Sequence, residues 1–178
     1  MRNKTEFIEA DTMLDAYLDI ETTGLSRIFN EITVIGLYLA GRTEDSLVQL
    51  VGGEVTKENL MEALKGVNTI YTYNGSRFDL PFIYSYLRVD LSDYFYHHDL
   101  MYDCWRNNLY GGYKTVEKCL GIPRKTIGIS GFEAVTLWHT YQRDGYLKAL
   151  ALLLEYNKED VVNLKTLRDR FLIRGTSK

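Results

Sequence analysis

The stretch Tyr17-Leu18-Asp19-Ile20-Glu21-Thr22-Thr23-Gly24-Leu25 begins with a strict alternation of residue types. The alternation predicts a β-strand over residues 15–21 that places Asp19 and Glu21 on one face and apolar side chains on the other. Two carboxylates on one face of a core strand repel each other and lose hydration. A shared divalent cation would resolve the conflict, and so would a strand face that is open to water.

The remaining periodicity predicts strands first, then alternating elements, then helices, which is the pattern of an α/β domain with a mixed sheet. The first three strands are expected to form an antiparallel meander, and the second is apolar throughout, as in a central strand. After the first strand, the predicted strands cover residues 32–40, 46–51, 68–73 and 94–97, and the predicted helices cover residues 57–64, 78–87, 100–109, 114–120, 132–143 and 146–171.

Composition sets the outer limits on function. A chain of 178 residues is the size of one domain, and we expect residues 1–178 to form a single domain with a core over about 14–171. The net charge of −3 argues against a protein that coats nucleic acid by bulk charge. Two cysteines, no apolar leader behind Met1 and no apolar run of membrane-spanning length predict a cytoplasmic protein that does not enter membranes.

The last predicted helix carries an aspartate on its apolar face. Tyr156 and Asp160 lie one turn apart within a stripe that should face the core, whereas Lys158, Lys165 and Arg168 lie off the stripe. A buried aspartate needs a partner, because burial of an uncompensated carboxylate is costly. The partner is either a structural hydrogen-bond donor or a ligand of the site, and Tyr156 can place its hydroxyl beside it.

A third acidic position follows the segment Tyr73-Asn74-Gly75-Ser76-Arg77-Phe78-Asp79. Taken alone, Asp79 is best explained as a carboxylate that a helix N-terminus favours. Asn74-Gly75 would suit a hairpin turn, but the helical period that follows it argues against a hairpin.

These three segments, in this order, resemble the exonuclease motifs of the DEDD (DnaQ-like) 3′→5′ exonucleases. The third segment, Tyr156-Asn157-Lys158-Glu159-Asp160, matches the tyrosine branch of that superfamily, and residues 128–131 look closest to YprB-like exonuclease domains. The resemblance covers about residues 14–170. It implies a ribonuclease-H-like fold in which helices flank a mixed five-stranded sheet.

The resemblance also implies a role for each matching residue. Asp19, Glu21 and Asp160 would hold one divalent ion, Asp19 would bridge to a second, and Asp79 would support that second ion. Oxygen ligands of this kind suit two Mg²⁺ or Mn²⁺ ions, and Tyr156 would orient the attacking water. The residues implied to meet the substrate are Thr22, Thr23, Gly24, Leu25, Asn74 and Phe78.

The predicted function is therefore metal-dependent hydrolysis of DNA or RNA from a 3′ end, with a single-stranded end as the expected partner. Two bound divalent ions would change the formal charge from −3 to +1, so part of the acidity belongs to the site. A nucleic-acid-binding module without catalysis and an endonuclease of the same fold are the alternatives. Arg124 and Lys125 are expected on a loop that either contacts phosphate or faces solvent, and Lys114 stays unassigned.

Overall fold

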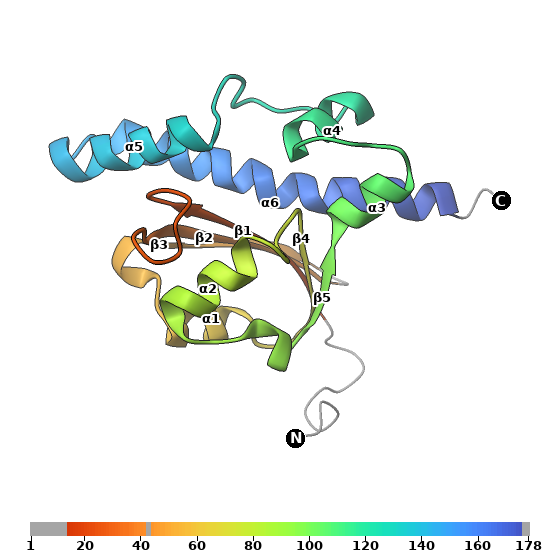
Figure 1. Ribbon diagram of the computed structural model, residues 1–178, viewed down its shortest axis with the longest axis horizontal. Helices are drawn as coiled ribbons and strands as arrows, with labels where there is room; N and C mark the ends of the chain where they lie inside the picture. Colours follow the sequence, from red (N-terminus) through yellow and green to blue (C-terminus); the bar gives the residue numbers. More distant parts are fainter. Residues whose placement is uncertain (1–13, 42–43, 176–178) are drawn as a thin grey trace.

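A mixed sheet with the strand order β3-β2-β1-β4-β5 forms the centre of the molecule (Figure 1). The computed structural model describes residues 14–41 and 44–175. Strands β1, β2 and β3 form the predicted antiparallel meander, and β4 and β5 add in parallel beside β1. The strands are β1 (Leu14–Thr22), β2 (Ile32–Ala40), β3 (Asp45–Val51), β4 (Val67–Thr72) and β5 (Tyr96–Asp99).

Six α-helices and two short 3₁₀ turns complete the fold within the described ranges. Thr56 caps the first helix by accepting a hydrogen bond from the Asn59 backbone, and Ser130 and Glu133 form the predicted capping box. No helix in the described part of the chain is long and apolar enough to cross a bilayer. The helical elements are η1 (Gly52–Glu54), α1 (Lys57–Ala63), α2 (Asp79–Leu87), η2 (Leu91–Asp93), α3 (Leu100–Arg106), α4 (Tyr113–Leu120), α5 (Gly131–Asp144) and α6 (Leu147–Gly175).

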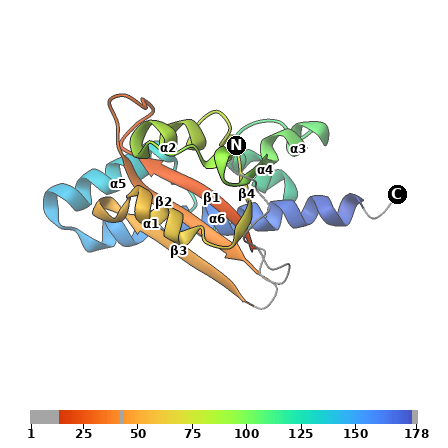
Figure 2. The ribbon, with the colours of Figure 1, turned by 90° about the horizontal axis from the view of Figure 1, so that it is seen from below.

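Helices cover both faces of the sheet, and the alternation in β1 decides which residues they meet. Leu18 and its apolar neighbours pack into one core with α1 and α2. Tyr17, on the opposite face, packs into a second core with α3, α4 and α6. Figures 1 and 2 show α1 and α6 on opposite sides of the strands. Asp19 and Glu21 therefore point toward α6, because they share a strand face with Tyr17.

Three predicted elements, β5, α3 and α6, have boundaries that are wrong by two residues or more. Helix α6 runs to Gly175, four residues beyond its predicted end, and the local backbone explains the other two differences. The fifth strand starts two residues later than predicted, because the amides of Tyr94 and Phe95 are bonded to the Leu91 carbonyl of η2. Helix α3 ends at Arg106, before Asn108 adopts a positive φ of 58°. The first 13 residues, in which no secretory leader is expected, lie outside the described residues.

Candidate nuclease site

Three carboxylates from two elements converge beside the end of β1. Asp19 and Glu21 come from β1, and Asp160 comes from α6, which crosses this face of the sheet. One oxygen of each lies within 4.8 Å of the others. Glu21 and Asp160 are buried, and Asp19 is half-buried. The structure thus brings together three of the four residues expected to hold metal.

The charges of this group conflict in the absence of a cation. Burial, followed by repulsion from the neighbouring carboxylates, raises the pKa of Asp19 and of Glu21 well above the usual range. Glu21 Oε1 is buried and has no hydrogen-bond partner among the described residues. A buried carboxylate that has an unpaired oxygen and lies close to two other carboxylates is an arrangement that a hard divalent cation would satisfy.

Asn157 holds Asp19 in place from α6. Its side-chain nitrogen lies 3.2 Å from Asp19 Oδ2, and its oxygen accepts a hydrogen bond of 3.0 Å from Gln49. Asn157 reaches the strand because Gly36 of β2 lacks a side chain, since a Cβ at Gly36 would lie 2.2 Å from the Asn157 oxygen. The glycine and the asparagine together fix how closely α6 approaches the carboxylates.

Asp79, the fourth predicted metal ligand, lies beside the group of three and outside its 4.8 Å limit. It is buried at the start of α2 and accepts a hydrogen bond of 3.2 Å from the Ile20 amide on β1. Burial raises the pKa of Asp79 to about 7, although this hydrogen bond opposes the shift. Its link to β1 is direct, so it supports the strand between the two cluster residues.

The raised pKa of Asp79 predicts an unusual pH dependence for the stability of the metal-free protein. The folded state keeps a proton on this carboxyl up to about pH 7, whereas the unfolded chain releases it near 3.8. Stability should therefore fall as pH rises between these values. Asp79→Asn removes the titration, so its stability relative to wild type should rise by about 1–3 kcal/mol between about pH 5 and pH 8. Urea unfolding in chelator at both pH values measures this change, and a constant difference would contradict it.

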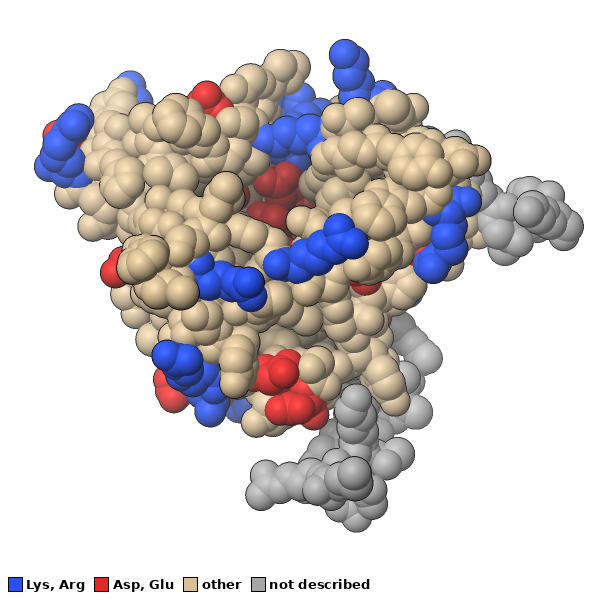
Figure 3. All heavy atoms as spheres, in the orientation of Figure 1, with Lys and Arg blue, Asp and Glu red and all other residues tan. Residues whose placement is uncertain are grey.

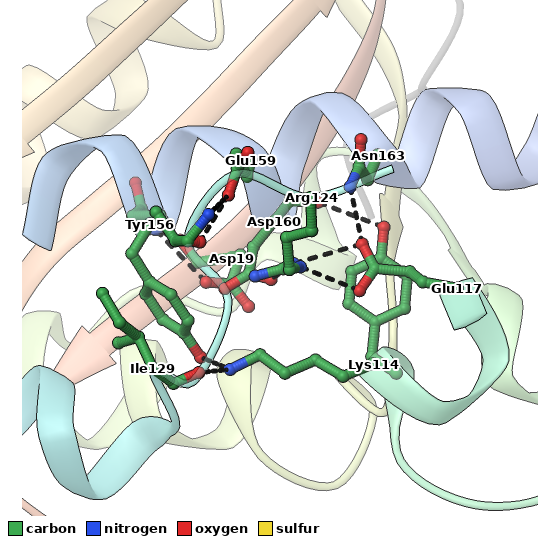
Figure 4. Close-up of polar contacts among 12 residues, drawn as sticks. Asp19, Lys114, Glu117, Arg124, Ile129, Tyr156, Glu159, Asp160 and Asn163 are labelled. Atoms are coloured by element: carbon green, nitrogen blue, oxygen red, sulfur yellow. Dashed lines mark hydrogen bonds and ion pairs between the residues drawn. The ribbon is translucent and has the colours of Figure 1, made fainter. Parts of the chain in front are cut away.

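The prediction for Arg124, that it contacts phosphate or faces solvent, is wrong. Its guanidinium is instead buried between two carboxylates. Its side chain is 10% exposed and forms ion pairs with Glu117 of α4 and with Asp160 (Figure 4). Burial would lower the pKa of Arg124, but Asp160 and Glu117 raise it above its usual value. Burial raises the pKa of Asp160 to about 6, with Arg124 and Lys114 acting against that rise. The loop residue Arg124 is thus a structural partner of Asp160, which was one of the two alternatives.

Tyr156 lies next to the carboxylates, and Lys114 holds its hydroxyl. Lys114 Nζ donates a hydrogen bond of 2.7 Å to the Tyr156 oxygen and another to the Ile129 carbonyl (Figure 4). Burial and then the charges of Asp160, Glu21 and Asp19 raise the pKa of Tyr156 above its ordinary value of 10.0. The hydroxyl therefore keeps its proton near neutral pH. Because its oxygen already accepts from Lys114, this proton is free to be donated into the site.

Two cavities meet at the carboxylates, and Asp19, Tyr156 and Asp160 line both. The larger, of about 510 Å³, is also lined by apolar side chains, including Leu25, Phe78 and Phe132. The smaller, of about 340 Å³, is lined by Lys114 among others. Figure 3 shows acidic side chains on the floor of a hollow that has Lys and Arg side chains around it.

The end of β1 and the residues directly after it form one edge of the larger cavity. Thr22, Thr23, Gly24 and Leu25, four of the predicted substrate contacts, all line it. Thr22 Oγ1 donates a hydrogen bond of 2.7 Å to the Gly24 carbonyl, and Thr23 Oγ1 accepts one of 3.0 Å from the Glu31 amide. The Leu25 side chain is 86% exposed at the mouth of this cavity.

Phe78 and Asn74, the other two expected substrate contacts, differ in placement. Phe78 lines the larger cavity, whereas Asn74 lines neither of the two. Asn74 has a φ of 62°, and its backbone amide donates a hydrogen bond of 2.7 Å to the carboxylate of Asp99. Asp99 also accepts from Ser76, so it shapes the turn that leads into α2. Asn74 thus belongs to the turn that precedes α2 and not to the lining of either cavity.

Sequence reasoning missed several residues of the site. Phe132 lines the larger cavity although it is 77% exposed, and no signal in the sequence distinguishes it from a surface phenylalanine. Asn157 stands within the third motif, but only its complete burial beside Gly36 shows its role. Glu117 is a buried acid whose importance follows from its contact with Arg124.

The sheet order and the position of the carboxylates are those of a ribonuclease-H-like fold. A family model described as RNase_H superfamily matches residues 16–172, and the chain belongs to that superfamily. No curated protein gives a significant match.

Several solved structures share the fold at low sequence identity, including the following three. The first is a family B DNA polymerase from the archaeon Pyrobaculum calidifontis, with a TM-score of 0.68, 16% identity and coverage of 89% of this chain and 24% of the polymerase chain. This chain thus spans about a quarter of that polymerase. A structure described as the apo form of a nuclease has a TM-score of 0.58, 22% identity and coverages of 91% and 74%. Brucella melitensis NrnC with bound Mg²⁺ has a TM-score of 0.55, 17% identity and coverages of 94% and 77%.

Proposed function

We propose that this protein is a metal-dependent 3′→5′ exonuclease of the tyrosine branch of the DEDD superfamily, similar to YprB-like domains. The observation that carries the proposal is the convergence of Asp19, Glu21 and Asp160 within 4.8 Å, with Glu21 Oε1 buried and unpaired in the described part of the chain. Membership of the RNase_H superfamily supports a nuclease. The substrate we propose is the single-stranded 3′ end of DNA or RNA.

The proposed ligands are carboxylates only, which favours Mg²⁺ or Mn²⁺ over softer metals. Asp19, Glu21 and Asp160 would hold one ion, and Asp19 with support from Asp79 would hold the second. Two such ions supply an activated water and stabilise charge on the attacking and leaving oxygens of a phosphodiester. The protein contributes the fixed position of the ligands, since Asn157 holds Asp19 and Arg124 holds Asp160.

Tyr156 would position the attacking water. A tyrosine whose pKa is raised is a poor general base, so its hydroxyl acts as a hydrogen-bond donor. Lys114 occupies an acceptor position of the Tyr156 oxygen, which directs the hydroxyl proton elsewhere. Holding a water in line with the phosphorus atom lowers the entropy cost of the reaction.

The larger cavity would receive the terminal nucleotide. Its apolar lining suits the face of a base, and Leu25 and Phe132 stand exposed at its border. The backbone from Thr22 to Gly24 would lie near the sugar.

Phe132→Ala should weaken substrate binding without affecting the fold. Stacking of a base on an aromatic side chain contributes about 1–3 kcal/mol, so KM should rise about tenfold or more while kcat changes less. Steady-state kinetics on a short single-stranded oligonucleotide measures both constants. Ile127→Ala is a matched control, because Ile127 is 86% exposed and lies outside the cavity lining. An equal KM for the two variants would argue against this nucleotide site.

A cleavage panel tests the proposed activity. The purified protein is incubated with end-labelled single- and double-stranded DNA and RNA, in Mg²⁺, in Mn²⁺ and in chelator. We expect stepwise release of mononucleotides from single strands, only with a divalent ion. A protein that binds these strands without cutting any of them would instead be a nucleic-acid-binding module.

A further inference from the structure

The positively charged guanidinium of Arg124 lies in direct contact with Asp160, one of the proposed cation ligands. Its Nη2 atom donates to Oδ1 of Asp160 in a contact between two side chains that are both at least nine-tenths buried. The same guanidinium donates through Nε and Nη2 to the two oxygens of Glu117, over 2.9 and 3.1 Å. Arg124 thus lies between two acids, and only one of them, Asp160, belongs to the carboxylate cluster (Figure 4).

The loop that carries Arg124 is fastened to the same helix as Asp160. Glu159 of α6 accepts hydrogen bonds from the amides of Lys125 and Thr126, over 2.6 and 2.9 Å. Asn163, one turn after Glu159, donates a hydrogen bond of 2.7 Å to Glu117 and another of 3.2 Å to the Pro123 carbonyl. The position of the guanidinium relative to Asp160 is therefore set by contacts on both sides of Arg124.

The two ion pairs of Arg124 are unequal. Glu117 is held through two nitrogens, Asp160 is held through one, and Nη1 is buried without a partner among the described residues. Loss of the Asp160 contact would leave Arg124 attached to Glu117. The guanidinium can thus release the cluster carboxylate without becoming an unpaired buried charge.

We infer that Arg124 is a positioning residue for Asp160 and an internal counter-ion of the cluster, which competes with the divalent cation for this carboxylate. The inference rests on the cation site of the proposed function. In the metal-free protein the guanidinium offsets part of the charge of three close carboxylates. A cation that binds to the same carboxylates meets a positive charge at ion-pair distance from Asp160, and this repulsion lowers its affinity.

Two substitutions should change metal affinity in opposite directions. Arg124→Gln removes the competing charge but keeps a hydrogen-bond donor, and should tighten Mn²⁺ binding about tenfold. Glu117→Gln removes the acid that draws Arg124 away from Asp160, and should weaken Mn²⁺ binding to a similar degree. A merely structural role for the loop would lower the affinity in both variants.

The test is isothermal titration of the full chain with Mn²⁺ after treatment with a chelator. Arg168→Gln is the matched control, because it removes an ion pair of α6 with Asp15 that lies outside the carboxylate cluster. The control should keep the wild-type dissociation constant within about twofold. Titration measures binding alone, so the result does not depend on catalysis.

Equal or weaker Mn²⁺ binding by Arg124→Gln would overturn the inference. If Arg124→Gln does not fold, the Mn²⁺ affinity of Glu117→Gln is the test. Tighter Mn²⁺ binding by Glu117→Gln would also overturn the inference. A wild-type protein that binds no Mn²⁺ would remove the proposed cation site and the inference with it. Binding by wild type with no change in either variant would remove the inference alone.

Discussion

Replacement of Asp19 with asparagine is expected to reduce release of 3′ nucleotides about 10³-fold while the metal-free protein stays folded. Asp19 carries a charge that burial and its neighbours disfavour, as the raised pKa shows. The neutral side chain removes that charge and still accepts the hydrogen bond from Asn157. The variant should therefore be as stable as wild type or more stable in chelator, and a gain of about 1 kcal/mol would raise Tm by roughly 2–4 °C.

Asp15→Asn is the matched control on the same strand. Asp15 forms an ion pair of 2.5 Å with Arg168 and lies outside the cluster. This substitution should lower the melting temperature and leave cleavage nearly unchanged, which is the opposite of the result expected for Asp19→Asn. Single-turnover cleavage and thermal unfolding of both variants measure the contrast. Loss of stability together with activity in Asp19→Asn would indicate a structural role instead.

Divalent ions are expected to stabilise the protein strongly. A ligand that binds only the folded state adds about 2.7 kcal/mol at one hundred times its dissociation constant. For a chain of this size, millimolar Mn²⁺ or Mg²⁺ should raise the melting temperature by roughly 5–10 °C. The reason is the relief of repulsion among Asp19, Glu21 and Asp160, together with a partner for Glu21 Oε1.

Thermal unfolding with and without chelator measures this stabilisation. Asp15→Asn should keep the full shift, whereas Asp19→Asn should lose most of it. A wild-type melting temperature that does not change with either ion would contradict the proposed cation site, whatever the activity of the protein. A shift of equal size in Asp19→Asn would place the ion elsewhere on the protein.

The sequence predicted the parts of the site that depend on local periodicity. The alternation in residues 15–21 placed Asp19 and Glu21 on one strand face, and the stripe on the last helix placed Tyr156 and Asp160 on its inner side. Both patterns are properties of a single element, so they survive folding unchanged. The mixed five-stranded sheet followed from the order of the elements and from the resemblance.

The parts that were not predicted depend on contacts between distant segments. Arg124 has an ambiguous sequence context, and its burial follows because Glu117 of α4 binds its guanidinium and Glu159 holds its loop against α6. Asn157 contacts Asp19 only because Gly36 lets α6 approach the sheet. No periodicity within one element encodes the distance between a loop, a helix and a strand.

The most direct test is to compare linear and circular single strands in Mn²⁺. A linear strand labelled at its 5′ end should shorten stepwise from the 3′ end, and a circle of the same sequence should stay intact. Chelator and the Asp19→Asn substitution should each stop the shortening. Cleavage of the circle, immediate release of the 5′ label as a mononucleotide, or undiminished shortening by Asp19→Asn would contradict a 3′→5′ exonuclease built on these carboxylates.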